Sequence, residues 1–198
     1  MVALNVGLWL DQLHTALRAV QCRVGGSSAD YEAAASTVAE RLAAVKQAGG
    51  TVWWAGNGGS ASLCAHLSQD MLNKLGMRSM TLSDAGLLTC MANDYGYRNI
   101  YARPLAVLLR PGDLVIAVSS SGRSENILAV AETAHAAGAR LITLSAFADD
   151  NPLWHTAADV AFFLPCALYG HAEVGHEALM HAIIESVWLR EQKSGCEA

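Results

Sequence analysis

The segment Thr51-Val52-Trp53-Trp54-Ala55-Gly56-Asn57-Gly58-Gly59-Ser60 decides the fold of this chain. Its apolar half predicts a buried strand, and its glycine-rich half predicts a loop that leads into a helix. Glycines permit positive φ and close approach of the backbone, while the first turn of a helix presents unpaired N–H groups and the positive end of its dipole. The segment therefore indicates a pocket for a phosphorylated ligand, to which Ser60 adds a hydroxyl donor. Because it matches neither the dinucleotide fingerprint nor a P-loop, an ordinary tight turn remains the alternative.

A second segment repeats this architecture. An apolar run over residues 114–118 predicts a buried strand, a polar loop of small residues follows at 119–124, and a helical pattern covers 125–138. The serines of the loop supply hydroxyl and backbone donors for phosphate oxygens with little steric bulk. A serine-rich turn is also a common helix N-cap, so this loop alone is not specific.

Composition narrows the class of protein. With 198 residues, 53% hydrophobic and 16% charged, the chain predicts one globular domain and enough apolar surface for an oligomer. A net charge of −5 argues against nonspecific nucleic-acid binding. No apolar stretch reaches the roughly 20 residues needed to span a bilayer, and residues 1–20 lack a signal-peptide pattern, so we expect a cytoplasmic protein without a membrane partner. The five cysteines are scattered without metal-type spacing, as expected of reduced thiols.

Alternating strands and helices predict an α/β fold with a mainly parallel sheet covered on both faces. Two amphipathic helices at the N-terminus precede the sheet and are expected to pack against a neighbour. The expected helices cover residues 4–24, 31–47, 60–75, 86–93, 103–109, 125–138 and 172–192. The expected strands cover residues 51–55, 78–82, 114–118, 140–145 and 160–164.

Histidines and carboxylates recur at helical spacing on two of these helices. His66 and Asp70 lie four residues apart and therefore share one helix face. On the last helix, Glu173 and His181 are separated by about two turns, and His176 and Glu177 lie between them. If the fold brings the two helices together, His66, Asp70, Glu173 and His181 would form a four-ligand metal site. A solvent-facing or structural role for these side chains remains the alternative.

In combination, these motifs resemble the phosphoheptose isomerases of the sugar isomerase (SIS) superfamily. The resemblance rests on Gly56 to Ser60, on His66, on residues 92–96, on the serine loop at 119–124 and on His181. It implies a three-layer α/β/α sandwich of the flavodoxin-like SIS type with a central five-stranded parallel sheet. It also implies one SIS domain over residues 1–198, with N-terminal helices at about 4–48 for oligomerisation and an α/β core at about 51–192. Members form homotetramers with active sites at subunit interfaces.

The resemblance also assigns roles to individual residues. The catalytic set would be Asp70 or Glu173 as the base and His181 as the acid. Some members bind zinc, which implies a divalent metal, Zn²⁺ for example, on His66, Asp70, Glu173 and His181. Here Asp70 stands where members carry glutamate, Glu173 where they usually carry glutamine, and Lys74 where many carry arginine. The substrate-binding positions would be Asn57, Gly58, Gly59, Ser60, Lys74, Asp94, Ser119, Ser120, Ser121 and Ser124.

The activity implied by the resemblance is conversion of sedoheptulose 7-phosphate to D-glycero-D-manno-heptose 7-phosphate, an aldose–ketose isomerisation through an enediol. An isomerase of another phosphosugar is one alternative. A noncatalytic SIS adaptor that binds the bacterial replication initiator is another, but it would not need both Asp70 and His181. A sugar-phosphate-sensing domain is disfavoured because no basic helix-turn-helix segment is visible.

Overall fold

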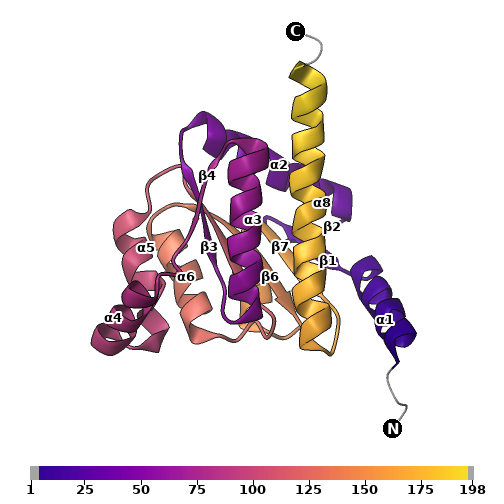
Figure 1. The fold of residues 1–198 in the computed structure, drawn as a ribbon, viewed down its shortest axis with the longest axis horizontal. Coiled ribbons are helices and arrows are strands. Elements are labelled where there is room, and N and C mark those ends of the chain that lie inside the picture. The colour runs from indigo at the N-terminus through magenta and orange to yellow at the C-terminus, as the bar shows by residue number, and fades with distance from the viewer. Residues whose placement is uncertain (1–4, 196–198) are drawn as a thin grey trace.

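The computed structural model describes residues 5–195 and places a seven-stranded sheet at the centre of the molecule (Figure 1). Five strands are parallel and include all those that the sequence predicts. In chain order the parallel strands follow the flavodoxin-like sequence 2-1-3-4-5 across the sheet. The complete order is β2 (Ser27–Ala29), β1 (Gln21–Val24), β7 (Val160–Leu164), β6 (Arg140–Ala146), β5 (Leu114–Ser119), β3 (Thr51–Ala55) and β4 (Arg78–Thr81).

The hairpin formed by β1 and β2 corrects the expected five-stranded sheet and the expected helix over residues 4–24. Helix α1 ends at Arg18, and the chain then pairs antiparallel with β7, which places Cys22 opposite Phe162. Gly25 and Gly26, both at positive φ, form the turn to β2. The amphipathic pattern of the helix continues into the strand, and burial of Cys22 in the core favours the extended conformation there.

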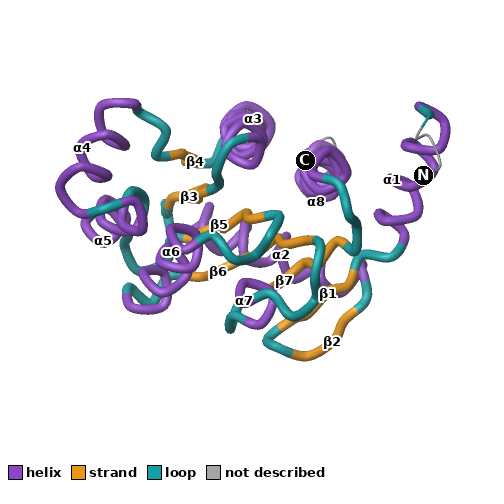
Figure 2. The backbone as a smooth tube through the Cα atoms, turned by 90° about the horizontal axis from the view of Figure 1, so that it is seen from below, coloured by secondary structure: helices purple, strands orange, loops and turns teal. Residues whose placement is uncertain are grey.

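Helices cover both faces of the sheet (Figure 2). One face packs against α2 (Tyr31–Gln47), α3 (Gly59–Leu75) and α8 (Tyr169–Gly195). The other packs against α4 (Ala85–Tyr95), α5 (Ala102–Leu108), α6 (Glu125–Ala136) and the short α7 (Pro152–His155). Helix α1 (Val6–Arg18) lies beside α8, and a 3₁₀ turn covers Tyr97–Asn99. This is the expected three-layer sandwich.

Two adjacent tryptophans in β3 show how one strand serves both layers. Successive side chains of a strand point to opposite faces, so Trp54 packs on the α3 side and Trp53 on the α5 side. Each indole N–H is satisfied, by Ser79 Oγ at 3.0 Å and by Asp113 Oδ2 at 3.1 Å respectively. Both rings are therefore core residues, as the sequence predicts.

The order of the strands creates a crevice between β3 and β5. These neighbours are both followed by helices, but α3 packs on one face of the sheet and α6 on the other. Ligands of open α/β sheets bind outside the carboxyl ends of the strands at such a point, where the chain winds away in both directions. The two loops expected to bind phosphate therefore meet at the same place. No helix within residues 5–195 has the length and apolarity required to cross a membrane.

Helix α8 is fixed to the sheet by two features of its N-terminal half. The backbone of Gly175 lies so close to Leu164 of β7 that a Cβ would overlap that side chain. The buried imidazole of His176 places Nε2 3.1 Å from the Ser145 carbonyl oxygen of β6. Burial lowers the pKa of His176 to about 4, against the opposing effect of this hydrogen bond. A charged imidazole is thus strongly disfavoured in the folded protein.

We expect acid to destabilise the fold partly through His176. The pKa of His176 is lower in the folded than in the unfolded chain, so its stabilising contribution is present above about pH 6.5 and is lost as the pH falls towards 4. The variant His176→Gln lacks this titration. Its free energy of unfolding should therefore fall less on acidification than that of the wild type, by up to about 3 kcal/mol. Urea unfolding at several pH values measures this free energy, with exposed His14→Gln as the control. Equal pH slopes for wild type and His176→Gln would contradict the assignment.

Candidate active site

A polar pocket of about 240 Å³ opens at the carboxyl ends of β3 and β5. Backbone amides, hydroxyls and one carboxamide make up most of its wall, and a single carboxylate, that of Glu173, joins them. The lining residues are Asn57, Gly58, Gly59, Ser60, Val118, Ser119, Ser120, Ser121, Ser124, Tyr169 and Glu173. A wall rich in donors fits an anionic ligand that carries several oxygens.

The first turn of α3 points its donors into this pocket. Gly58 is the N-cap residue, has φ +54° and provides no side-chain cap. The leading N–H groups of α3 therefore have no side-chain acceptor at the cap, and the positive end of the helix dipole lies with them. A phosphate at this position would satisfy these groups.

The serine loop supplies the opposite wall. Ser119 Oγ donates to Ser124 Oγ at 3.1 Å, and the buried Ser120 hydroxyl has no hydrogen-bond partner within the described structure. Three other buried groups of the described residues share this property, namely Thr143 Oγ1, Ser145 Oγ and His176 Nδ1. Arg123 turns away from the pocket and pairs with Asp150 at 2.6 Å on the surface.

A reciprocal pair of amides joins the two loops. Asn57 Nδ2 donates to Asn126 Oδ1 at 2.9 Å, and Asn126 Nδ2 donates to Asn57 Oδ1 at 2.8 Å. Tyr101 adds a third tie, because its hydroxyl donates to the Gly56 carbonyl at 2.8 Å. Sequence reasoning missed Asn126, which is fully buried. An amide in the first turn of a helix after a serine loop was the only signal available.

Beyond the pocket, α3 and α8 run side by side in the same direction (Figure 1). Their side chains meet at regular intervals. The Glu173 carboxylate lies where a Cβ of Gly59 would be. Further along, residues of α3 and α8 form pairs, each with one member from either helix. The pairs are His66 with Glu177, Asp70 with His181, and Lys74 with Glu185.

The central part of this contact brings together three possible metal ligands. His66, Asp70 and His181 each offer one ligand atom, and these atoms lie within 4.8 Å of one another. His181 Nδ1 is 3.2 Å from Asp70 Oδ2, and the two imidazole rings meet edge to face with centroids 5.0 Å apart. Two imidazoles and a carboxylate form a donor set that suits Zn²⁺ and other first-row divalent ions. The described residues therefore fit the metal that the sequence predicts.

Lys74 controls the charge of Asp70. Burial of Asp70 acts to raise its pKa, but the hydrogen bond from Lys74 Nζ at 2.9 Å and the charges of Lys74 and the two histidines outweigh it and lower the pKa. In turn, hydrogen bonds to Asp70 and Glu185 raise the pKa of Lys74. Asp70 is thus held as a carboxylate and is a weaker base than an unpaired one.

The predicted site residues divide into three groups. Asn57 to Ser60 and the four serines of the second loop all line the pocket, together with Glu173. His66, Asp70 and His181 form the group beyond it, which Glu173 does not join. Lys74 lies further along α3 at Asp70, and Asp94 lies on α4, where it accepts from the Asn93 amide at 2.8 Å. Neither Lys74 nor Asp94 lines the pocket.

Tyr169 is a pocket residue that the sequence reasoning missed. It begins α8, and its ring packs edge to face on Phe147 with centroids 4.9 Å apart. Phe147 has φ +69°, which is a strained backbone for a residue other than glycine. The tyrosine thus forms an aromatic wall beside the serine loop. Its place just before the histidine-rich helix was the only available signal.

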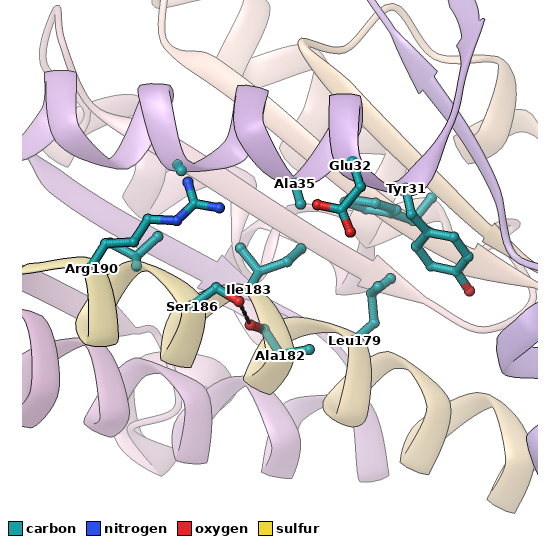
Figure 3. A pocket seen from close by; sticks show the side chains of 11 residues that line it. Tyr31, Glu32, Ala35, Leu179, Ala182, Ile183, Ser186 and Arg190 are labelled. Carbon is teal, nitrogen blue, oxygen red and sulfur yellow. Dashed lines mark hydrogen bonds between the residues drawn. The ribbon is translucent and has the colours of Figure 1, made fainter.

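Another cavity, of about 170 Å³, lies between α2 and α8 (Figure 3). Its wall is mainly apolar, with the Glu32 carboxylate on α2 and the Arg190 guanidinium on α8. Ser186 Oγ donates to the Ala182 carbonyl at 2.6 Å, within its own helix. Because it lacks the glycine-rich and serine loops that could cradle an anion, this cavity is not the candidate active site.

Comparison with known proteins connects this geometry to a family. A family model described as the SIS domain matches residues 18–146. The phosphoheptose isomerase of Trichlorobacter lovleyi is 30% identical over 165 residues, which cover 80% of this chain and 83% of the relative. That of Mycobacterium tuberculosis is 32% identical over 160 residues, which cover 78% and 81%.

Solved structures support the same relationship. A phosphoheptose isomerase from Neisseria gonorrhoeae superposes with a TM-score of 0.71 at 26% identity and covers 78% of this chain and 86% of its own. One from Francisella tularensis gives a TM-score of 0.80 at 22% identity and covers 94% and 98%. The second likeness concerns the fold alone.

The amide pair between the two loops generates a prediction. Asn57→Ala or Asn126→Ala leaves the other amide without its partners and should cost about 1–3 kcal/mol. Because the two residues contact each other, the double variant should lose less free energy of unfolding than the two single variants lose together, with a coupling energy of about 0.5–3 kcal/mol. Urea unfolding of the wild type, the single variants and the double variant measures this coupling. Exposed Asn73 lies far along α3, so Asn73→Ala combined with Asn126→Ala should be additive. Additivity for Asn57 and Asn126 as well would show that the pair does not hold the loops together.

Proposed function

This chain belongs to the SIS domain family, and we propose that it is a phosphoheptose isomerase that converts sedoheptulose 7-phosphate to D-glycero-D-manno-heptose 7-phosphate. The observation that carries this proposal is the pocket at β3 and β5. It combines a helix N-terminus and serine hydroxyls with one carboxylate, that of Glu173. Phosphate binding and proton abstraction are the two functions that such an isomerase needs at one site.

The phosphate would lie against the first turn of α3 and the serine loop. Ser60 and Ser120, which both line the pocket, would donate to it together with the leading amides of α3. Binding energy from this remote group would hold the sugar in place for the reaction. The carbonyl end of the sugar would then lie at Glu173, on the α8 side of the pocket.

Glu173 is the base that the geometry favours over Asp70. Its carboxylate lines the pocket, whereas that of Asp70 pairs with Lys74, which lowers its pKa and its strength as a base. Glu173 would remove the proton from the carbon next to the carbonyl and return it to the neighbouring carbon, which converts ketose to aldose through the enediol. Tyr169 would limit access of water to this side of the pocket.

His181 would supply the proton for the carbonyl oxygen and take up the proton of the neighbouring hydroxyl as the aldehyde forms. Its Nδ1 lies 3.2 Å from Asp70 Oδ2, so Asp70 would act by orienting the imidazole. A divalent metal held by His66, Asp70 and His181 would polarise the carbonyl oxygen and so supply the charge stabilisation that the proton of His181 supplies otherwise.

We further propose that the chain is one SIS domain that acts as a cytoplasmic homotetramer with active sites near subunit interfaces. Large apolar side chains are exposed on α1, α3 and α8, which supports assembly through these helices. They include Val6 and Leu10 on α1, Leu72 on α3 and Leu189 on α8. Asp94, exposed on α4, would reach a site only across such an interface.

The activity itself gives a direct prediction. Purified protein of known metal content, incubated with sedoheptulose 7-phosphate, should form the aldose phosphate. A chelator should slow the reaction if the metal carries the charge stabilisation, and should leave it unchanged if His181 does. A folded protein that binds the sugar phosphate but forms no product would point instead to another phosphosugar or to a noncatalytic adaptor.

The assignment of the base gives a second prediction. Glu173→Gln should lower kcat by about 10²- to 10⁴-fold, as expected for loss of a general base, while metal content stays unchanged. Asp70→Asn should lower metal content and turnover together, because the amide is a poorer ligand than the carboxylate. Steady-state kinetics and metal analysis on the same samples separate these outcomes. Normal turnover by Glu173→Gln would transfer the base role to Asp70.

A further inference from the structure

Glu177 on α8 contacts the metal-ligand group without belonging to it. Its Oε1 lies 2.8 Å from His66 Nδ1 on α3 and 4.0 Å from His181 Nε2, one turn along its own helix. The three ligand atoms of His66, Asp70 and His181 fall within 4.8 Å of one another, and this group does not include Glu177. Any influence of Glu177 on a bound metal would therefore pass through a histidine.

The short contact with His66 determines which ring nitrogen carries the proton. A carboxylate only accepts hydrogen bonds, so an imidazole nitrogen 2.8 Å from it must donate. In neutral His66 this requires the proton on Nδ1 and leaves the lone pair on Nε2, where a metal can bind. The hydrogen bond also fixes the orientation of the ring.

His66 depends more than the other two ligands on a hydrogen bond that fixes its orientation. Its side chain is 51% exposed, whereas those of His181 and Asp70 are 27% and 11% exposed. Asp70 is held by Lys74, and His181 by Asp70. Among the described contacts of His66, the hydrogen bond to Glu177 is the one that sets its tautomer, because the ring contact with His181 involves no donated proton.

We propose that Glu177 is the positioning residue of the metal centre, which fixes His66 in the Nδ1–H tautomer and presents Nε2 to a divalent cation. This proposal rests on the proposed function only in that a metal is expected at the site. The proposal gives different roles to two carboxylates of α8 that lie one turn apart. Glu173 serves the sugar-phosphate pocket, and Glu177 serves the histidines.

Zn²⁺ affinity of the full-length protein, measured without sugar by competition with a chromophoric chelator, tests the proposal. Glu177→Leu is close in size and removes the acceptor, and we expect about 10- to 100-fold weaker binding, the usual effect of losing a carboxylate behind a metal-bound histidine. Glu177→Gln retains an acceptor oxygen but not the charge and should lose less. Glu191→Gln is the matched control, because Glu191 lies on α8 and pairs with Lys46 on α2 instead.

The tautomer provides a readout that needs no metal. Spectra of ¹⁵N-labelled histidine should show neutral His66 protonated on Nδ1 in the wild type. The His66 signals are identified by their absence from His66→Gln. Glu177→Leu should shift them towards the Nε2–H form, and Glu177→Gln should not. A merely structural role for Glu177 would leave the tautomer unchanged.

The outcomes are distinct. Wild-type His66 in the Nε2–H form, or unchanged Zn²⁺ affinity in a folded Glu177→Leu protein, overturns the proposal. If Glu177→Leu does not fold, the wild-type tautomer and the Glu177→Gln affinity decide. A wild type that binds no Zn²⁺ also overturns it, and the isomerase assay on the same sample shows whether the proposed function fails with it.

Discussion

The parallel packing of α3 against α8 is the constraint on which the site depends. Gly59 has no Cβ, so the Glu173 carboxylate of α8 can reach the first turn of α3. From that contact the two helices continue in register, and each step of about four residues brings another pair together. On the sheet side, Gly175 and His176 fix the height and rotation of α8. The proposed phosphate pocket and the metal-ligand group thus lie along one helix pair.

Charge is distributed along this helix pair in a way that separates two kinds of chemistry. At the pocket end, helix N–H groups and hydroxyls face a single carboxylate, so an incoming phosphate meets many donors. At the far end, Lys74 lies between Asp70 and Glu185 and keeps Asp70 ionised. A carboxylate with a lowered pKa is a good ligand but a weaker base. The carboxylate at position 70 therefore suits metal binding, and the one at position 173 is the proposed base.

Much of the fold was predictable because buried parallel strands have a distinct sequence pattern. The continuous apolar runs at β3, β5 and β7 and the glycine or serine loops after β3 and β5 fixed the strands and the direction of the helices that follow. The hairpin of β1 and β2 was not predictable in this way. The four residues of β1 continue the amphipathic pattern of α1, and only pairing with the free edge of β7 favours a strand. The different positions of Glu173 and Glu177 were not predictable either, since both have helical spacing to His181.

The sequence by itself determined the α/β class, the two loops proposed to bind phosphate and the residue types of the candidate site, because these follow from local periodicity and from the chemistry of glycine, serine and histidine. Only the tertiary structure decided which partners meet. It joined Asn57 to Asn126, placed Glu173 in the pocket and Glu177 against His66, and left Lys74 at Asp70. The physical reason is that spacing along one helix fixes a face, whereas the register between two helices depends on close contacts, such as that at Gly59, made by residues distant in sequence.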